Sequence, residues 1–489
     1  MSHDNVHDVV DVEPVVVIGA GPVGLAAAAH LLERGLEFLV LEAGDAAGAS
    51  VARWGHVRLF SPWQYNVDDA ARRLLEASGV ALPDPASLPT GAELVDAYLR
   101  PLSRLASLAA RIRYNADVVA ISRDRLDRVS GTDRAHAPFV VRLADGEEMT
   151  AGAVIDATGT WRTPNVLGAN GLPAFGEDAA SPWIDYALPD VLGTDRATYA
   201  NRHTVVVGAG HSAATTLLAL SELKDVTADT RVTWALRAPA PDAAYGGGAD
   251  DELPARGALG SGLQVLVQTG RVDLVTGFAV QGIDVVSPVV TLRGSGDMSI
   301  DADRIVAATG YRPDWGLTRE LRVDLDPIVD ASRQLAPLID PNVHSCGTVY
   351  AHGVDEVAHP EPGYFAVGAK SYGRAPTFLM ATGYEQIRSV VAALAGDWVA
   401  ARERQLDLPA TGVCSVTHGL HAITAELGLS ADLPDKLMSA TARHMSDSAT
   451  PGQAVLAAAD ELHLDHSVAL RFAAFATEQD SRSRPAGDE

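Results

Sequence analysis

The feature that most constrains the fold of this chain is a short apolar strand that leads directly into a glycine-rich turn. Residues 15–18 form an uninterrupted β-branched run, which is typical of a buried parallel strand. The turn Gly19-x-Gly21-x-x-Gly24 follows at once, and residues 26–32 favour a helix. The first glycine allows the tight turn, the second lets the backbone approach a pyrophosphate, and the third lets helix and strand pack closely. The order of strand, glycine turn and helix predicts a dinucleotide-binding unit. The alternative is an ordinary glycine-rich turn in an α/β protein, which would not require that order.

A second strand, residues 38–41, ends in Glu42, where a carboxylate can meet a ribose hydroxyl. The same order returns further along the chain. A strand at 204–207 leads into Gly208-x-Gly210-x-x-Ala213 and a helix at 215–223. Two such units imply two nucleotide ligands, and the usual chemical reason to hold two is hydride transfer from a nicotinamide to a flavin.

The next strand of the second unit, residues 231–236, ends at Arg237 instead of at an acid. An acid at this position binds the ribose 2′-hydroxyl of NADH, whereas a guanidinium can pair with the 2′-phosphate of NADPH. The residue therefore favours NADPH. The alternative is a solvated arginine at the end of a strand.

Length and charge narrow the class of protein. A chain of 489 residues is too long for one core, so two or three domains are expected. The 38 basic and 63 acidic residues give a net charge of −25, which argues against nucleic acid and anionic membranes as partners. Residues 1–13 are acidic and polar and do not read as a signal peptide. A cytoplasmic enzyme fits these features.

The two cysteines do not form a recognisable redox or metal motif. Cys346 and Cys414 are far apart, and there is no C-x-x-C. On a helix Cys414, His418 and His421 would share one face, but no fourth ligand is evident, so no metal is predicted.

The segments between the units predict how the chain is divided. Residues 53–63 mix aromatic and cationic side chains and read either as a loop crossing the flavin or substrate face or as a plain surface loop. Strands ending in Thr-Gly are expected at 153–159 and 304–310, and residues 161–200 read as a connector rich in proline and glycine. A helix is expected to start at Pro376 and run to Leu394.

With these residues in hand, the chain resembles the flavoproteins with two dinucleotide-binding domains. Within that group it is similar to the flavin-containing and N-hydroxylating monooxygenases. Four motifs carry the resemblance over roughly residues 14–395. They are Gly19-x-Gly21-x-x-Gly24 with Glu42, the turn from Gly208 to Ala213, Asp156-Ala-Thr-Gly159, and Asp303-x-x-x-Ala307-Ala308-Thr309-Gly310-Tyr311.

The resemblance implies an α/β fold of two Rossmann-like domains, the second inserted in the first. The FAD-binding domain would comprise 14–165 and 301–395, and the NADPH-binding domain 200–300. Outside the resemblance, the sequence itself predicts a helical C-terminal extension at 400–480 and flexible termini at 1–13 and 481–489. The implied cofactors are FAD and NADPH. The implied partners are O2 and a small organic substrate, and the extension would serve in packing or in a homodimer contact.

The motifs and the resemblance together assign the contacts to the cofactors. The implied cofactor-binding residues are Gly19, Ala20, Gly21, Pro22, Val23, Gly24, Glu42, Ala43, Trp54, Val119, Thr158, Gly159, Gly208, Gly210, His211, Ser212, Ala213, Arg237, Thr309, Gly310, Tyr311, Gly368, Thr377 and Phe378. Thr377 and Phe378 are expected to donate backbone N–H groups to the flavin because Pro376 has none. No catalytic residue is assigned, since the flavin carries the chemistry. The candidates are Trp54, His56, Lys370 and Arg374, the last two being surface cations in the alternative reading.

Two features bear on the reaction. The motif of the N-hydroxylating enzymes usually has leucine where this chain has Ala307, and the histidine of the Baeyer–Villiger fingerprint is missing after Phe175. The resemblance implies a monooxygenase that forms a C4a-(hydro)peroxyflavin. The alternatives are a flavin reductase or dehydrogenase that inserts no oxygen, and a flavin-binding sensor without catalysis.

Overall fold

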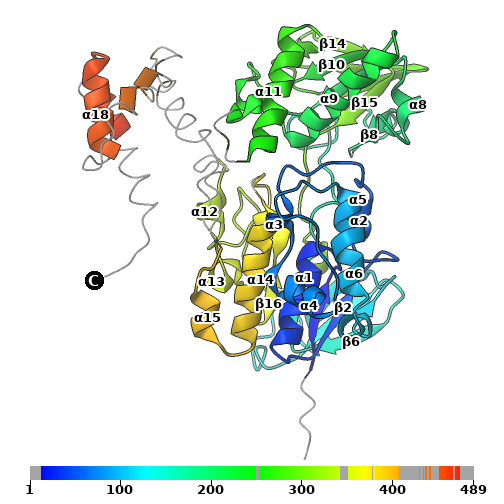
Figure 1. The fold of residues 1–489 in the computed structure, drawn as a ribbon, viewed down its shortest axis with the longest axis vertical. Helices are drawn as coiled ribbons and strands as arrows, with labels where there is room; N and C mark the ends of the chain where they lie inside the picture. Colours follow the sequence, from blue (N-terminus) through cyan, green and yellow to red (C-terminus); the bar gives the residue numbers. More distant parts are fainter. Residues whose placement is uncertain are drawn as a thin grey trace, which may run out of the picture.

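Two α/β units, one above the other in Figure 1, make up most of the described chain. The computed structural model describes residues 13–186, 188–248, 251, 253–341, 351–376 and 378–406, and in the C-terminal region 424, 429, 433, 436, 437, 440, 441, 451–465 and 468–473. Within these residues, no helix is long and apolar enough to cross a membrane.

The first unit is built on a parallel sheet in the order β16-β7-β1-β2-β3. Its strands are β1 (Val15–Ile18), β2 (Phe38–Leu41), β3 (Ile112–Arg113), β7 (Ala153–Asp156) and β16 (Tyr364–Ala366). One face packs on helices α1 (Pro22–Glu33), α4 (Asp69–Ala77) and α14 (Met380–Leu394). An antiparallel sheet covers the other face and comprises β4 (Val118–Arg123), β5 (Phe139–Leu143) and β6 (Glu148–Ala151). Both faces are buried, which explains why β1 and β7 read as continuous apolar runs.

The second unit repeats this three-layer plan. Its parallel sheet has the order β11-β10-β9-β15-β8. The strands are β8 (Ile184–Asp185), β9 (His203–Val207), β10 (Arg231–Ala235), β11 (Asp273–Val275) and β15 (Arg304–Ala307). Helices α9 (His211–Val226) and α11 (Pro254–Gln268) cover one face, and the antiparallel strands β12 (Gly282–Val286), β13 (Val289–Arg293) and β14 (Ser299–Ala302) cover the other. The expected α/β fold, with the second unit inserted in the first, is confirmed.

The inserted unit extends beyond the limits expected from the sequence. The return to the first unit was expected at residue 301, yet Arg304–Ala307 pairs in parallel with β9, so β15 belongs to the second sheet. On the other side of the insertion, β8 pairs with β15. The expected limit is therefore wrong, because the apolar Ile305-Val306-Ala307 run finds its partner in the nearer sheet and not in the sheet of β1.

Short helical segments connect the strands of both units. They are α2 (Ala49–Ala52), α3 (Trp63–Asn66), α5 (Gly91–Leu94), η1 (Val95–Leu99), α6 (Arg100–Ser103), α7 (Ala106–Ala109), η2 (Ser181–Trp183), α8 (Arg196–Tyr199), α10 (Asp242–Tyr245), η4 (Gly316–Thr318), α12 (Ala336–Ile339), α13 (Val354–Val357), η5 (Gly368–Tyr372) and α15 (Trp398–Arg402). Local capping fixes some of them. At α5, for example, the Thr90 hydroxyl accepts the Glu93 N–H at 3.1 Å, and the Glu93 carboxylate accepts the Thr90 N–H at 2.7 Å.

The helix that was expected to begin at Pro376 begins at Met380, so that prediction is wrong by one turn. The residue before it, Leu379, has an extended backbone with φ −112° and ψ 148°, so the helix does not include it. Phe378 instead packs edge-on against Tyr372, with ring centroids 5.3 Å apart. This packing directs the Phe378 ring toward Tyr372, outside the helix.

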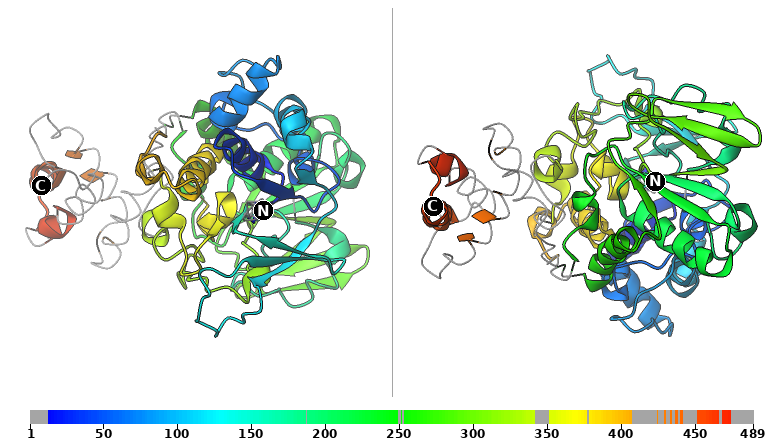
Figure 2. Two further views of the ribbon diagram at one scale, coloured as in Figure 1. Left: turned by 90° about the horizontal axis from the view of Figure 1, so that it is seen from below. Right: turned by 90° about the horizontal axis from the view of Figure 1, so that it is seen from above.

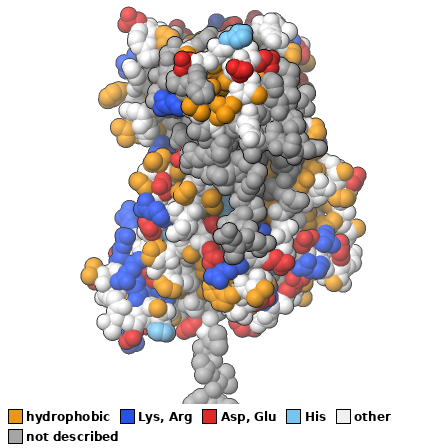
Figure 3. All heavy atoms as spheres, turned by 90° about the vertical axis from the view of Figure 1, so that its left-hand side faces the viewer, with side chains coloured by type: hydrophobic (Ala, Val, Ile, Leu, Met, Phe, Trp, Pro, Cys, Tyr) orange, Lys and Arg blue, Asp and Glu red, His pale blue; other side chains and the backbone are white. Residues whose placement is uncertain are grey.

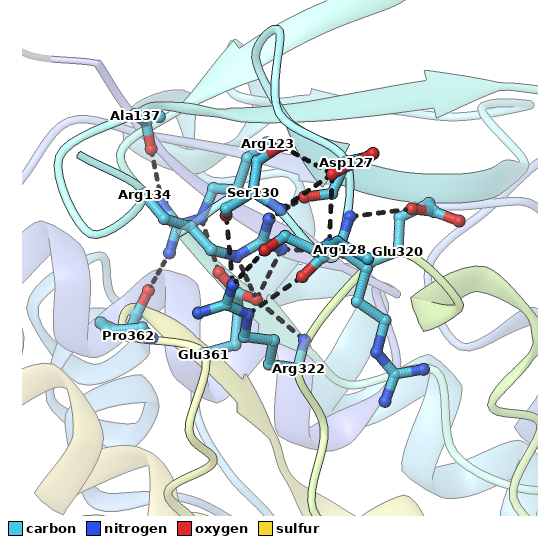
Figure 4. A network of polar contacts seen from close by, with 11 residues as sticks. Arg123, Asp127, Arg128, Ser130, Arg134, Ala137, Glu320, Arg322, Glu361 and Pro362 are labelled. Carbon is cyan, nitrogen blue, oxygen red and sulfur yellow. Dashed lines mark hydrogen bonds and ion pairs between the residues drawn. The ribbon is translucent and has the colours of Figure 1, made fainter. Parts of the chain in front are cut away.

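A buried ion network fastens the β4–β5 connection to the segment before β16. The fully buried Glu361 accepts from Arg123 Nε and Arg134 Nη2, each at 2.8 Å, and from the Arg322 N–H at 2.8 Å (Figure 4). Burial alone would raise the pKa of Glu361, but these hydrogen bonds outweigh it and lower that pKa. The network fixes the entry into β16, whose far end leads to Gly368.

The C-terminal region carries a small core of its own. Helix α18 (Pro451–Glu461) packs through Val455 and Ala458 against residues that include Leu437 and Phe472. Figure 2 shows α18 to one side of the two units in both views. On the face shown in Figure 3, acidic and basic side chains both reach the surface of the first unit.

Candidate functional site

The first glycine turn has the geometry that its spacing predicts. Gly19 has a φ of +104°, and a Cβ there would lie 2.8 Å from the Ala157 oxygen. A Cβ on Gly24 would lie 1.9 Å from the Gly19 oxygen, so this glycine lets α1 pack onto the turn. A Cβ on Gly21 would meet nothing within 4 Å. Gly21 therefore borders open space at the N-terminus of α1, where a phosphate group fits.

Glu42 lies at the end of β2 beside this turn. Its carboxylate accepts the Ala20 N–H at 2.6 Å and the Gly44 N–H at 2.8 Å, and the side chain stays half-buried. These bonds hold the carboxylate at the edge of the sheet from which a ribose would be reached. The neighbouring Ala43 is exposed.

The end of β7 brings a buried charged pair close to the first turn. Asp156 accepts the Lys370 ammonium at 2.6 Å and the Tyr364 hydroxyl at 2.9 Å, and all three side chains are buried. The Thr158 hydroxyl also donates to Asp156, at 2.7 Å. Burial, and then the nearby Asp156 charge, raise the pKa of Tyr364. Through Asp156, the ion pair with Lys370 thus holds the Thr158-Gly159 turn in place at the end of β7.

The two cationic candidates have different surroundings. The alternative reading of Lys370 as a surface cation is wrong, because its side chain has no exposed surface and lies 5.0 Å from the Trp315 ring centroid. Arg374 is half-exposed and ion-paired to Asp330. Catalytic roles for both residues stay predictions.

The second glycine turn matches the first. Gly208 has a φ of +136°, and a Cβ there would lie 2.1 Å from the Ala308 oxygen. Gly210 borders open space, as Gly21 does, with nothing within 4 Å of a Cβ. Ala213, which is fully buried, occupies the position in this turn that Gly24 occupies in the first. The Trp234 indole N–H donates to the Gly208 oxygen at 2.7 Å. The exposed Arg237 follows β10 and donates to the Ala169 oxygen at 2.9 Å.

Aromatic side chains link the first unit to the second at this edge. Trp161, in the connector, stacks on Tyr311 with centroids 5.0 Å and planes 27° apart, and Trp54 lies 6.5 Å from Trp161. Phe60, in the 53–63 loop, lies 4.9 Å from the His211 ring. The loop therefore lies against the connector through Trp54 and against the start of α9 through Phe60, and it does not merely cover the surface of its own unit.

The connector also fixes the turn after β15. Asn165 exchanges backbone and side-chain hydrogen bonds with Thr309 and Gly310, at 2.9 Å in each case. The sequence analysis did not single out Asn165, because nothing local marks it as a partner of a residue 144 positions away.

The remaining predicted residues are placed as follows. His56 is exposed, and Val119 is 46% exposed in β4. Pro22 and Val23 are the first two residues of α1. Val23 packs close to Gly368, because a Cβ on Gly368 would lie 3.1 Å from the Val23 Cγ2. Ser212 follows His211 in the first turn of α9. Thr377, Cys346, Cys414, His418 and His421 lie outside the described residues. Within the described part of the chain, no three metal-ligand side chains cluster.

A cavity of about 380 Å³ lies on another side of the first unit. Residues of α1, α4 and α14 line it, including His30, Asp68 and Tyr384. His30 is near the C-terminal end of α1, whereas the glycine turn is at its N-terminus. The cavity therefore lies away from both glycine turns, and the nucleotide sites expected at those turns stay predictions.

Comparisons with known proteins agree with this geometry. A family model described as pyridine nucleotide-disulphide oxidoreductase matches residues 16–346. The indole-3-pyruvate monooxygenase YUCCA1 of Oryza sativa subsp. japonica is 29% identical over 199 residues, which cover 40% of this chain and 42% of that relative.

Three solved structures share the fold. The bacillithiol disulfide reductase of Bacillus cereus has a TM-score of 0.56 at 21% identity and covers 78% of this chain and 99% of its own. The FAD-bound cadaverine monooxygenase DfoA of Erwinia amylovora has a TM-score of 0.54 at 17% identity, with 82% and 99% covered. The ornithine N-hydroxylase of Kutzneria sp. 744 has a TM-score of 0.51 at 18% identity, with 79% and 99% covered.

Proposed function

We propose that this chain, which belongs to the pyridine nucleotide-disulphide oxidoreductase family, is an FAD- and NADPH-dependent monooxygenase of a small organic molecule. It is a flavin-dependent oxidoreductase with monooxygenases among its relatives. The observation that carries the proposal is the pair of matched glycine turns, each with open space beside its second glycine.

The residues of the first turn fit FAD. The open position at Gly21 leaves room for a pyrophosphate on the N-terminus of α1, and Glu42 is held where it can accept from the adenosine ribose. FAD would supply the redox chemistry, accepting a hydride and activating oxygen. The protein would bind it, orient it and keep water away.

The residues of the second turn fit NADPH. Gly210 leaves the same opening on the N-terminus of α9, and Arg237 ends the neighbouring strand, where the 2′-phosphate of NADPH would lie. Arg237 is exposed and bonded to a single backbone oxygen, so its guanidinium retains donors for a phosphate.

Exclusion of water favours oxygen insertion over simple reduction. The stack of Trp161 on Tyr311, with Trp54 beside it, places apolar surface at the edge shared by the two units. A dry site protects an oxygen-activating flavin from losing peroxide. The chain has two cysteines and no C-x-x-C, so it lacks the dithiol pair that disulfide reduction usually employs.

A second candidate function is an NAD(P)H-dependent flavin reductase or dehydrogenase without oxygen insertion. The fold shared with a bacillithiol disulfide reductase favours it, since that architecture also serves enzymes named for reduction.

Rapid mixing with oxygen separates the two candidates. The FAD-reconstituted protein is reduced anaerobically with NADPH and mixed with oxygenated buffer while its absorbance is followed. A monooxygenase should show a resolved spectral phase between reduced and oxidised flavin. Direct return to oxidised flavin, with stoichiometric hydrogen peroxide for every substrate tried, would favour the reductase.

A further inference from the structure

Two basic side chains converge beside the second glycine turn from the first turns of two different helices. His211 is the first residue of α9, and Arg256 is the third residue of α11. Neither helix has an acid in its first turn. A cation at a helix N-terminus is poorly placed, because the helix dipole already makes that end positive. The Arg256 guanidinium, which stays charged, therefore calls for a nearby anion.

The anion that the structure supplies is Asp251. Its carboxylate pairs with Arg256 through both oxygens, Nε to Oδ2 at 2.7 Å and Nη2 to Oδ1 at 2.8 Å, and both side chains are less than one-tenth exposed. Asp251 also accepts the Leu253 N–H at 2.9 Å, just before α11 begins. One carboxylate thus serves the guanidinium and the start of the helix.

An aromatic ring from the first unit covers this group. Phe60 lies 4.9 Å from the His211 ring, and the Arg256 guanidinium lies 6.0 Å from the Phe60 centroid. Desolvation, followed by repulsion from Arg256, lowers the pKa of His211, whereas Asp251 opposes the shift. Because Phe60 lies against both side chains, His211 and Arg256 face one small region beside the second turn.

We propose that Arg256 is a phosphate-binding residue of the second nucleotide site, and that Asp251 holds its place until a dinucleotide pyrophosphate takes over the guanidinium. This inference rests on the proposed function, because it concerns the nucleotide expected at Gly210. A pyrophosphate carries more negative charge than one carboxylate and matches the bidentate geometry of arginine. Arg237 would read the 2′-phosphate, whereas Arg256 would bind the part that NADPH and NADH share.

The separate roles of Arg256 and Arg237 predict different effects of their substitution on the affinities for NADP+ and NAD+. The full-length, FAD-reconstituted protein is titrated calorimetrically with NADP+ and, separately, with NAD+. Arg256→Gln should weaken both by a similar factor, about tenfold to a hundredfold for one lost charged hydrogen bond. Arg237→Gln should weaken NADP+ alone. Arg231→Gln, at the opposite and exposed end of β10, is the matched control and should change neither.

Asp251→Asn distinguishes a ligand from a structural pair. Its amide oxygen can still accept the Leu253 N–H, while the charge that competes for Arg256 is gone. NADP+ should then bind more tightly than to the wild type. If Asp251→Asn weakens binding as Arg256→Gln does, the pair is structural and the inference is wrong.

The inference and the proposed function fail differently. If Gly210→Val and Arg237→Gln weaken NADP+ as expected but Arg256→Gln leaves both nucleotides within about twofold of the wild type, only the inference is overturned. If the wild-type protein binds neither nucleotide, the proposed function fails and the inference with it. Circular dichroism and bound FAD content verify that each variant is folded.

Discussion

Replacing Gly21 with valine should strongly weaken FAD binding while leaving the fold intact. Gly21 has φ −78° and ψ −172°, an extended conformation that a β-branched residue adopts readily. A Cβ at this position would meet nothing within 4 Å of the protein itself. The new side chain would therefore occupy only the space assigned to the pyrophosphate.

The magnitude follows from the N–H groups at the start of α1. Pro22 is the first helical residue and has no N–H, so Val23 and Gly24 are the first helical residues that can donate to a phosphate. Each charged hydrogen bond contributes about 1.5–3 kcal/mol. Losing two would cost roughly 3–6 kcal/mol, which weakens FAD binding by about a hundredfold to ten-thousandfold.

The assay compares FAD content after purification and the dissociation constant after reconstitution. Gly24→Ala is the contrasting variant, because its Cβ would lie 1.9 Å from the Gly19 oxygen and should destabilise the protein itself. Wild-type FAD affinity in a folded Gly21→Val protein would refute the assignment of the pyrophosphate to this turn.

Three further outcomes are expected. Gly210→Val, at the equally open position of the second turn, should retain FAD but lose reduction by NADPH, as anaerobic absorbance would show. Arg237→Gln should lower the preference for NADPH over NADH about tenfold to a hundredfold, measured as the ratio of flavin reduction rates; an unchanged ratio would exclude its role. Burial lowers the pKa of His359 to about 4, so the unfolded state binds the proton first. The stability contributed by neutral, buried His359 is present above pH ~6.5 and lost toward pH 4. The free energy of unfolding should therefore fall by roughly 2 kcal/mol between about pH 7 and pH 5. His359→Gln should therefore flatten the fall of the melting temperature over that range, and an equally steep fall would contradict the assignment.

The parts of the fold that local pattern determines could be predicted from the sequence. The two turns at Gly19 and Gly208 follow from spacing, because only glycine accepts the close approach of Ala157 and Ala308. Glu42 was found for the same reason, since it lies at a fixed distance from its turn along the chain.

The parts that long-range contacts determine could not be predicted. An apolar run such as Ile305-Val306-Ala307 suits either sheet, and only pairing with β9 decides which. From the sequence, the fully buried Lys370 could be either a catalytic candidate or a surface cation, and only Asp156, 214 positions away, shows that it is buried in an ion pair. Arg256 and Asp251 sit in a stretch with no motif, and only the fold brings Phe60 to them.

An anaerobic titration of the FAD-reconstituted, full-length protein with NADPH is the most direct test of two cooperating nucleotide sites. We expect close to one equivalent of NADPH to bleach the visible band of the bound flavin, and the same addition to leave the Gly210→Val variant oxidised. A wild-type flavin that stays oxidised with both NADPH and NADH, yet is reduced by dithionite, would contradict hydride transfer between the two sites.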